Sequence, residues 1–153
     1  MRANDVVRAL EKRHKDDLHF TEMTTGSGRM DFWAMPRSWS KFGSKGYEIK
    51  VTRQDFERDD KWPSYVKACH YFSFACPWGL IDPSELPDGI GLLWVNKSGS
   101  AVSKKRAVHS KPDQVAFQET LVRAAWGKAA IRNPVTREAV SYTHLTLPTI
   151  CSV

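Results

Sequence analysis

The chain has 153 residues, 41% of them hydrophobic, which suits one globular domain with an ordinary core and argues against a disordered protein. Its 23 Lys and Arg outnumber its 17 Asp and Glu, and the net charge of +6 favours a polyanionic partner such as nucleic acid. No apolar run approaches the roughly 20 residues that span a bilayer, and the first residues lack the apolar segment of a secretory signal. We therefore expect a soluble, cytoplasmic protein with no membrane partner.

The first third of the chain predicts one helix followed by three strands. Val6, Val7 and Leu10 form an apolar stripe in a helix over about residues 4–16. Residues 18–35 hold two short runs rich in Phe, Thr, Met and Trp around the turn letters TGSG, which predict a β-hairpin with Asp31 just inside its second strand. A loop marked by its Pro, Gly and Ser content then leads to a strand over residues 46–51.

The remainder predicts helices and strands in alternation. Thr52 and Asp55 have the spacing of a capping box, so a helix should start at Arg53, and Pro63 should interrupt it. Residues 70–76 and 89–96 predict two further strands, and residues 101–109 follow a turn. A last helix over about 112–131 carries an apolar stripe formed by Val115, Leu121, Val122, Ala125 and Trp126. This order predicts a single α/β or α+β domain over residues 1–139, with a mixed central sheet flanked by helices.

The last 14 residues, 140–153, differ in composition from the rest of the chain. They read VSYTHLTLPTICSV and contain no Asp, Glu, Lys or Arg, whereas all charged residues lie in the first 139. The string resembles one reading frame of the transposon-end adapter used in sequencing libraries. We interpret it as an artefactual tail and leave it out of the fold prediction. A natural C-terminal strand is the alternative, because Thr, Leu and Val favour strands.

Three cysteines, Cys69, Cys76 and Cys151, are too few and too irregularly spaced for a disulfide framework or a zinc knuckle. We expect reduced thiols. A metal site formed by Cys69, His70 and Cys76 is conceivable, but His70 lies in an aromatic run and suits an ordinary packed histidine better.

The strand over residues 46–51 interrupts its apolar pattern with two charged residues. Because side chains alternate along a strand, Tyr47 and Ile49 share one face, and Glu48 and Lys50 share the other. The ordinary interpretation is a half-solvated strand with an ion pair on its polar face. The alternative is chemical: carboxylates from adjacent strands can hold a divalent cation, and a lysine beside them can stabilise the negative charge of a scissile phosphate. Consecutive strands usually pair, which would place Asp31 next to Glu48.

Asp31 and the later Glu48-x-Lys50, behind a first helix and before a second, resemble the PD-(D/E)xK nuclease superfamily, with its restriction-endonuclease-like core. Met30 stands where that pattern usually has a proline. The segments SGRMDFWAM, GYEIKVTRQDFERDDKWPSY and ELPDGIGLLWV are further similar to MmcB-like DNA-repair nucleases and related phage or prophage proteins, over roughly residues 4–108.

The resemblance implies metal-dependent cleavage of DNA, with Mg²⁺ or Mn²⁺ as the cofactor. Asp31 and Glu48 would be metal ligands, the backbone carbonyl of Ile49 a further ligand, and Lys50 the catalytic lysine. Glu22 would sit opposite the start of the second hairpin strand, where it could supply a third carboxylate. Glu11 on the first helix competes for that role, and the sequence leaves the choice open.

Basic residues surround the predicted site in the sequence. Arg29, Arg53, Lys61 and Lys67 could hold phosphates on either side of a cut, or could simply form an exposed charged surface. We assign phosphate binding to Arg29, Arg53 and Lys61, and an exposed surface position to Lys67.

The expected function is a magnesium-dependent DNA endonuclease or exonuclease, acting in DNA repair or in phage DNA metabolism. The expected partner is DNA, with repair proteins or a second copy of the chain as further partners. The alternative is a non-catalytic DNA-binding subunit of a repair complex that keeps the nuclease fold. A small-molecule metalloenzyme is less favoured, because the sequence lacks metal-binding histidine pairs and is basic.

Overall fold

A computed structural model describes residues 1–26 and 28–132, with the backbone alone for 128–132. The predicted tail over residues 140–153, including Cys151, lies outside the described residues. The predicted domain end at residue 139 lies outside them too.

One six-stranded mixed sheet forms the centre of the molecule. Its strands lie side by side in chain order: β1 (Leu18–Thr25), β2 (Gly28–Met35), β3 (Lys45–Ile49), β4 (Tyr71–Pro77), β5 (Gly91–Val95) and β6 (Ala101–Lys105). β1, β2 and β3 form an antiparallel meander, β3, β4 and β5 run parallel, and β6 returns antiparallel to β5. The predicted hairpin and the pairing of the second and third strands are confirmed.

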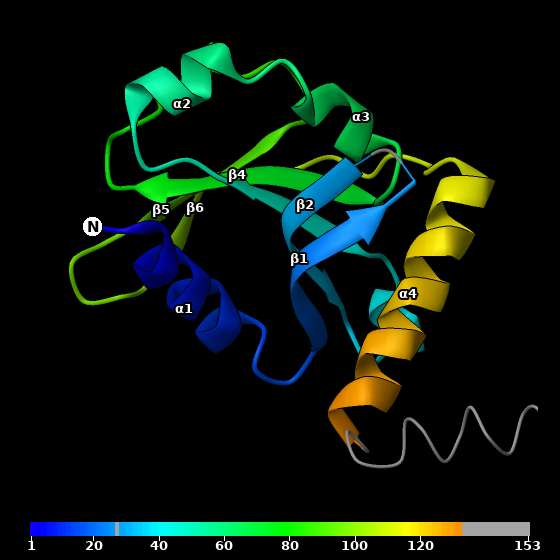
Figure 1. Cartoon of the computed structure of the whole chain (residues 1–153). Helices are drawn as coiled ribbons and strands as arrows, with labels where there is room; N and C mark the ends of the chain where they lie inside the picture. The colour runs from blue at the N-terminus through cyan, green and yellow to red at the C-terminus, as the bar shows by residue number, and fades with distance from the viewer. Residues whose placement is uncertain (27, 133–153) are drawn as a thin grey trace, which may run out of the picture.

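Helices cover both faces of the sheet (Figure 1). α1 (Ala3–Arg13) lies on one face, whereas α2 (Arg53–Arg58) and α3 (Trp62–Val66) lie on the other, between β3 and β4 in the chain. α4 (Gln114–Arg132) runs beside the hairpin of β1 and β2. Two short 3-10 helices, η1 (Trp39–Lys41) and η2 (Pro83–Glu85), lie in connections. The fold is therefore α+β, with a mixed central sheet flanked by helices, as the sequence predicts.

The sheet separates two hydrophobic cores. The smaller core lies under α1 and includes Val6, Leu10, Phe32, Tyr47 and Leu93. The larger one lies under α3 and α4 and includes Met30, Trp33, Tyr65, Phe72, Phe74 and Leu92. Tyr47 belongs to the smaller core, while Phe74, the register partner of Glu48 on β4, belongs to the larger one. The alternation along β3 therefore turns Tyr47 and Glu48 to opposite faces.

The predicted start of α2 and the predicted position of Pro63 are confirmed, whereas β3 ends earlier than predicted. The Thr52 hydroxyl accepts a hydrogen bond from the backbone N–H of Asp55 (3.1 Å), so α2 begins at Arg53 as predicted. Pro63 occupies the first turn of α3, where its missing N–H costs no helical bond. β3 ends at Ile49, so Lys50 lies directly beyond the strand, where its N–H still donates to the Ala75 carbonyl (3.0 Å).

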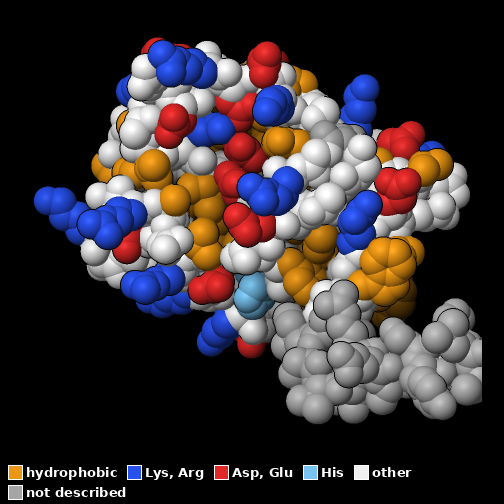
Figure 2. Space-filling view, viewed as in Figure 1, with side chains coloured by type: hydrophobic (Ala, Val, Ile, Leu, Met, Phe, Trp, Pro, Cys, Tyr) orange, Lys and Arg blue, Asp and Glu red, His pale blue; other side chains and the backbone are white. Residues whose placement is uncertain are grey.

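The predicted apolar stripe of the last helix is wrong. Val115, Leu121, Val122 and Trp126 are exposed, Trp126 at 67%, and Ala125 is exposed as well. The helix instead turns three small residues, Ala116, Thr120 and Ala124, toward the core. Apolar side chains are spread around this helix, so their spacing did not define one face, and small residues allow closer packing than the predicted ones. Figure 2 shows hydrophobic side chains gathered over α4.

Within the described residues, no helix is long and apolar enough to cross a membrane. Cys69 and Cys76 are free and buried, and burial raises the pKa of the Cys69 thiol to about 12. Such thiols stay protonated near neutral pH and are poor nucleophiles.

Candidate functional site

The candidate site forms where β2 and β3 separate. The ladder between them pairs Phe32 with Tyr47 and does not continue toward Asp31. The Asp31 carboxylate instead accepts a hydrogen bond from the backbone N–H of Ile49 (2.8 Å). This bond satisfies a partly buried donor that the ladder has left free, and it places Asp31 at the end of β3. Burial raises the pKa of Asp31, although the bond from Ile49 opposes the shift.

Glu48 is the most perturbed carboxylate of the site. The residue is only 8% exposed, and its Oε2 is buried without a hydrogen-bond partner among the described residues. Burial, together with the nearby charge of Asp31, raises the pKa of Glu48 to about 7. Two carboxylates that are buried side by side repel each other when both are ionised, so one keeps its proton more tightly.

Lys50 lies between two carboxylates. Its Nζ is 3.2 Å from Glu48 Oε1 and 2.5 Å from Asp59 Oδ2, and its side chain is 10% exposed. Burial alone lowers the pKa of a lysine, but the ion pairs with Asp59 and Glu48 outweigh it and raise the pKa of Lys50. Lys50 is therefore charged and held in place. The predicted grouping of Asp31, Glu48 and Lys50 at one end of β3 is present in the structure.

Asp59 is a site residue that the sequence analysis missed. Its side chain is 8% exposed, and its Oδ1 accepts the backbone N–H groups of Lys61 (2.9 Å) and Trp62 (3.3 Å) at the start of α3. Burial disfavours ionisation, but the ion pair with Lys50 and the bond from Lys61 hold the pKa of Asp59 below its ordinary value. An Asp shortly before Pro63 is a recognisable helix cap, but its contact with Lys50 depends on the tertiary fold.

The charged groups line an open cavity of about 450 Å³ between the end of β3 and the segment that joins α2 to α3. Asp31, Glu48, Ile49, Lys50 and Asp59 line it, together with Asp55, Arg58, Asp60, Lys61 and Tyr65. In the space-filling view, acidic side chains run in a line over this region, with basic side chains beside them (Figure 2). The cavity is therefore an acidic centre that is open to solvent.

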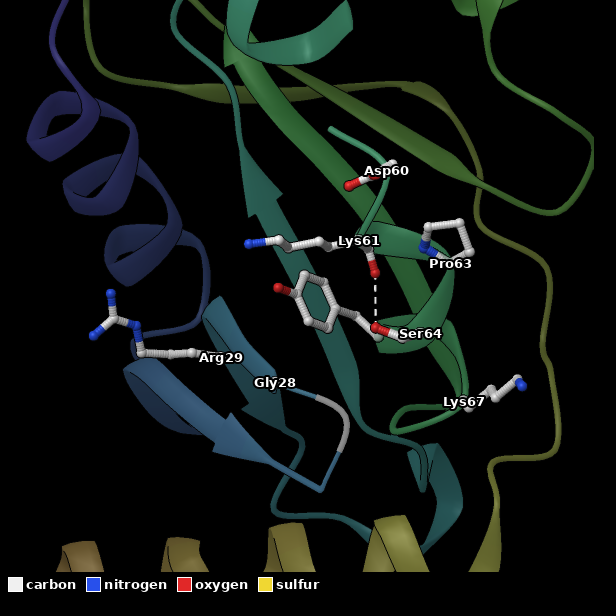
Figure 3. Close-up of a pocket in the computed structure, with 8 residues that line it drawn as sticks. Gly28, Arg29, Asp60, Lys61, Pro63, Ser64 and Lys67 are labelled. Atoms are coloured by element: carbon white, nitrogen blue, oxygen red, sulfur yellow. Dashed lines mark hydrogen bonds between the residues drawn. The ribbon is translucent and has the colours of Figure 1, made fainter. Parts of the chain in front are cut away.

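A larger cavity of about 800 Å³ adjoins the acidic one and shares Asp60, Lys61 and Tyr65 with it. Arg29, Lys61 and Lys67 line this second cavity (Figure 3). The side chains of Arg29 and Lys61 extend to the same side, whereas Lys67 extends away from them. Arg29 and Lys61 thus line the groove that adjoins the acidic centre, and Lys67 lines the wall of that groove as well.

Two of the other predicted site residues lie elsewhere. Arg53 binds both carboxylate oxygens of Glu85 (2.7 and 2.9 Å) and also contacts Glu57, so its guanidinium joins α2 to η2 and lines neither cavity. Glu22 is exposed on β1, with a left-handed backbone (φ 52°), and it too lines neither cavity. Glu11 is exposed on α1, on the other side of the sheet. The structure supplies no third carboxylate from Glu22 or Glu11.

The site fits a single divalent cation held by few protein ligands. Among the described residues, no group of three or more His, Cys, Asp or Glu side chains is arranged to hold a metal. Asp31 and Glu48 nevertheless present two neighbouring carboxylates, and the unpartnered Oε2 of Glu48 lacks the cation or donor that a buried oxygen normally has. Mg²⁺ commonly binds through one or two carboxylates while water and phosphate complete its shell, so the donor set suits it.

Neither a scan against family models nor a search of curated proteins finds a match to this chain. Among solved structures, a protein of unknown function from Silicibacter pomeroyi is similar, with a TM-score of 0.66 and 24% sequence identity. The match covers 88% of this chain and 93% of that one. At this identity the similarity shows a shared fold alone.

Proposed function

We propose that this protein is a metal-dependent nuclease that hydrolyses phosphodiester bonds in DNA. The buried, unpartnered Oε2 of Glu48, next to Asp31 and Lys50, carries the proposal. A buried carboxylate oxygen without a partner raises the free energy of the folded state, and carboxylates with a perturbed pKa in a cleft are typical of functional sites.

The carboxylates of Asp31 and Glu48, with the backbone carbonyl of Ile49, would hold the cation. A bound Mg²⁺ or Mn²⁺ would supply Lewis-acid activation of a phosphate ester and of the attacking water. Binding of the cation also favours the ionised form of Glu48, whose pKa is near 7 in the protein alone.

Lys50 would stabilise the negative charge that accumulates on the phosphate during hydrolysis. Its ion pair with Asp59 fixes the position of the ammonium group, and a fixed charge stabilises a transition state without a cost of reorganisation. Arg29 and Lys61, in the adjoining cavity, would hold the phosphates of the DNA strand on one side of the bond that is cut.

The order of elements agrees with the resemblance to PD-(D/E)xK nucleases. In this chain a helix, a three-stranded meander, two short helices and a parallel strand follow one another, and the acidic pair lies on the second and third strands. A role of the MmcB-like kind in DNA repair or phage DNA metabolism is part of the proposal and rests on the resemblance of the sequence segments.

A non-catalytic DNA-binding subunit is the second candidate. One observation favours it: the ammonium of Lys50 is engaged by two carboxylates, and no third acidic ligand joins Asp31 and Glu48 within the described residues. Such a protein would bind DNA through the basic groove and would not cleave it.

The test is a cleavage assay with the purified full chain on labelled single-stranded, duplex and branched DNA, in Mg²⁺, Mn²⁺ or EDTA. We expect cleavage that EDTA abolishes. Glu48→Gln and Asp31→Asn should reduce it by at least about 100-fold, because each removes a metal ligand while it keeps the side-chain shape.

The matched control is Asp88→Asn, which neutralises an exposed carboxylate outside both cavities and should leave the rate unchanged. Binding to the same DNA is measured in parallel by fluorescence anisotropy. Binding without cleavage in any metal would reject the nuclease and favour the non-catalytic subunit. Equal cleavage by the wild type and both site variants would reject the assigned residues.

A further inference from the structure

A third cavity lies on the α1 face of the sheet, away from the acidic centre. Its volume is about 170 Å³, and it lies between the end of α1, the first residues of β3 and β4, and the end of β6. Tyr47 forms part of its wall, whereas Glu48, the next residue, faces the other side. The two sites therefore share a strand but no opening.

Four basic residues line this cavity, and no acidic residue does: Arg13, Lys45, Lys105 and Arg106. Within the described part of the chain, none of the four forms an ion pair with a carboxylate. Positive charges that are gathered without counter-ions repel one another, and a bound anion would relieve that repulsion.

The four cations are not equally available. The ammonium of Lys105 donates to the backbone carbonyls of Leu86 (2.5 Å) and Pro87 (3.1 Å). Arg13 donates to the Ala101 carbonyl (3.2 Å) and also lies within hydrogen-bonding reach of the Tyr47 hydroxyl. The side chains of Lys45 and Arg106 form no hydrogen bond with any described residue. Lys45 and Arg106 are therefore the free donors, and Arg13 keeps further N–H groups for a ligand.

Two buried residues with hydroxyl groups, Ser73 and Tyr47, also line the cavity. Ser73 is 8% exposed, and its hydroxyl has no hydrogen-bond partner among the residues that the structure describes. Tyr47 is 4% exposed, and its hydroxyl lies 2.8 Å from Nε2 of His14. Nδ1 of His14 is in turn 2.7 Å from the Asp17 carboxylate, which fixes the position of the histidine and hence of the Tyr47 hydroxyl.

We propose that this cavity binds a phosphate group. A phosphate offers several acceptor oxygens and up to two negative charges, which match the side chains of Arg13, Lys45 and Arg106 and the hydroxyl of Ser73. The volume lies below the roughly 300 Å³ at which pockets for whole drug-sized ligands begin, so it suits one anionic group. The phosphate belongs either to a small phosphate monoester or to a nucleic-acid backbone that crosses this face.

The test is calorimetric titration of the full chain with inorganic phosphate at low ionic strength, with chloride as the reference anion. We expect phosphate to bind to the wild type and the Kd to rise at least ten-fold in the double variant Lys45→Gln, Arg106→Gln. The matched control is Lys41→Gln, Lys111→Gln, which removes the same charge from exposed positions outside this cavity. Ser73→Ala, which removes one donor and no charge, should weaken binding by a smaller factor.

A second pair of titrations identifies the source of the phosphate, with dAMP and with a 12-base-pair duplex. If the double variant binds dAMP more weakly but binds the duplex as the wild type does, the ligand is a small phosphate monoester. Weaker binding of the duplex as well, with a smaller salt dependence, indicates backbone phosphate. Either result supports the cavity. The absence of phosphate binding above the chloride reference, or equal losses in the double variant and its control, would overturn the proposal.

This inference does not depend on the proposed cleavage. Lys61→Gln changes the groove beside the acidic centre and should leave binding of inorganic phosphate in the third cavity unchanged. The absence of DNA cleavage would not change the conclusion from the phosphate titration. The absence of phosphate binding would not change the conclusion from the cleavage assay.

Discussion

Glu48 links the ionisation of the site to the stability of the fold. Its pKa is about 7 in the folded protein, against an ordinary value of 4.5. Between these two values the folded chain holds a proton that the unfolded chain has released. The stability from this group is therefore fully present below pH 4.5 and is lost as the pH rises through 7.

Glu48→Gln should remove this pH dependence. We expect the free energy of unfolding of the variant, relative to the wild type, to increase by about 2 kcal/mol between pH 4.5 and pH 7.5, because Gln cannot ionise. Urea unfolding at several pH values, without metal, measures the difference. Burial lowers the pKa of His14 and of His70, and because this effect is common to both proteins it cancels in the difference. A difference that stays constant with pH would show that Glu48 is not perturbed.

Asp59 positions Lys50, so replacing Asp59 should destabilise the protein more than replacing an exposed carboxylate nearby. Asp59→Asn keeps an oxygen that can accept the N–H groups of Lys61 and Trp62, but it removes the charge that faces Lys50. We expect the variant to lose about 2 kcal/mol of stability at pH 7, since the buried ammonium of Lys50 then keeps only Glu48 as a counter-ion.

The control is Asp60→Asn, the same substitution at the next residue, which is exposed. It should change the free energy of unfolding by less than about 0.5 kcal/mol. If cleavage is observed, Asp59→Asn should lower kcat with little effect on the Mg²⁺ concentration that gives half-maximal rate, because Asp59 contacts the lysine and not the proposed metal ligands. If the two substitutions have equal effects, Asp59 does not have the proposed role of positioning Lys50.

Among the elements, α4 shows how a helix can be predicted correctly and oriented wrongly. Its small residues Ala116, Thr120 and Ala124 are buried, and the Thr120 hydroxyl donates to the Ala116 carbonyl (2.8 Å). Near its end, a Cβ at Gly127 would lie 3.1 Å from the ring of Phe20 on β1. The helix and the hairpin therefore pack closely, which larger side chains on that face would prevent.

Paired substitutions test the orientation of α4. Val122→Gln should change the free energy of unfolding by less than about 0.5 kcal/mol, because Val122 is exposed. Ala124→Gln should cost about 2 to 4 kcal/mol, because it forces a larger and polar side chain into a packed interface. Chemical denaturation measures both. The reverse order of effects would mean that the stripe predicted from the sequence faces the core after all.

For the whole molecule, charge is arranged in three regions with different signs. An acidic centre lies at the end of β3, a basic groove adjoins it on the same face, and a basic cavity lies on the other face. The net charge of +6 is therefore not spread evenly. Local concentrations of charge of this kind decide where a polyanion binds, whereas the net charge only sets the average attraction.

The predicted tail over residues 140–153 can be tested by removing it from the chain. If residues 140–153 derive from adapter sequence, nothing has selected them to stabilise the domain, and a chain cut after Ala139 should keep the Tm and the DNA affinity of the full chain. Thermal melting and anisotropy titrations of both chains measure this. A loss of stability above about 2 kcal/mol, beyond the range of ordinary surface changes, would show that these residues belong to the folded domain.

Features that depend on neighbouring residues could be predicted from the chain's local patterns. The hairpin turn, the start of α2 at Arg53 and the opposite faces of Tyr47 and Glu48 follow from local spacing. The approach of Asp31 to Glu48 followed from the pairing of consecutive strands. Such features can be predicted because the interactions that create them join residues or strands that follow one another in the chain.

Contacts between segments that are separate in the chain depend on how the sheet and helices pack together. Arg53 is engaged by Glu85, 32 residues away, and so lies outside the groove to which the sequence assigned it. Lys50 forms an ion pair with Asp59. Arg13, Lys45 and Arg106 line one cavity because the sheet brings their segments together, and no local pattern in the sequence indicates this. The buried face of α4 was set in the same way, by which side chains allow close packing against β1 and not by the number of apolar residues on each face.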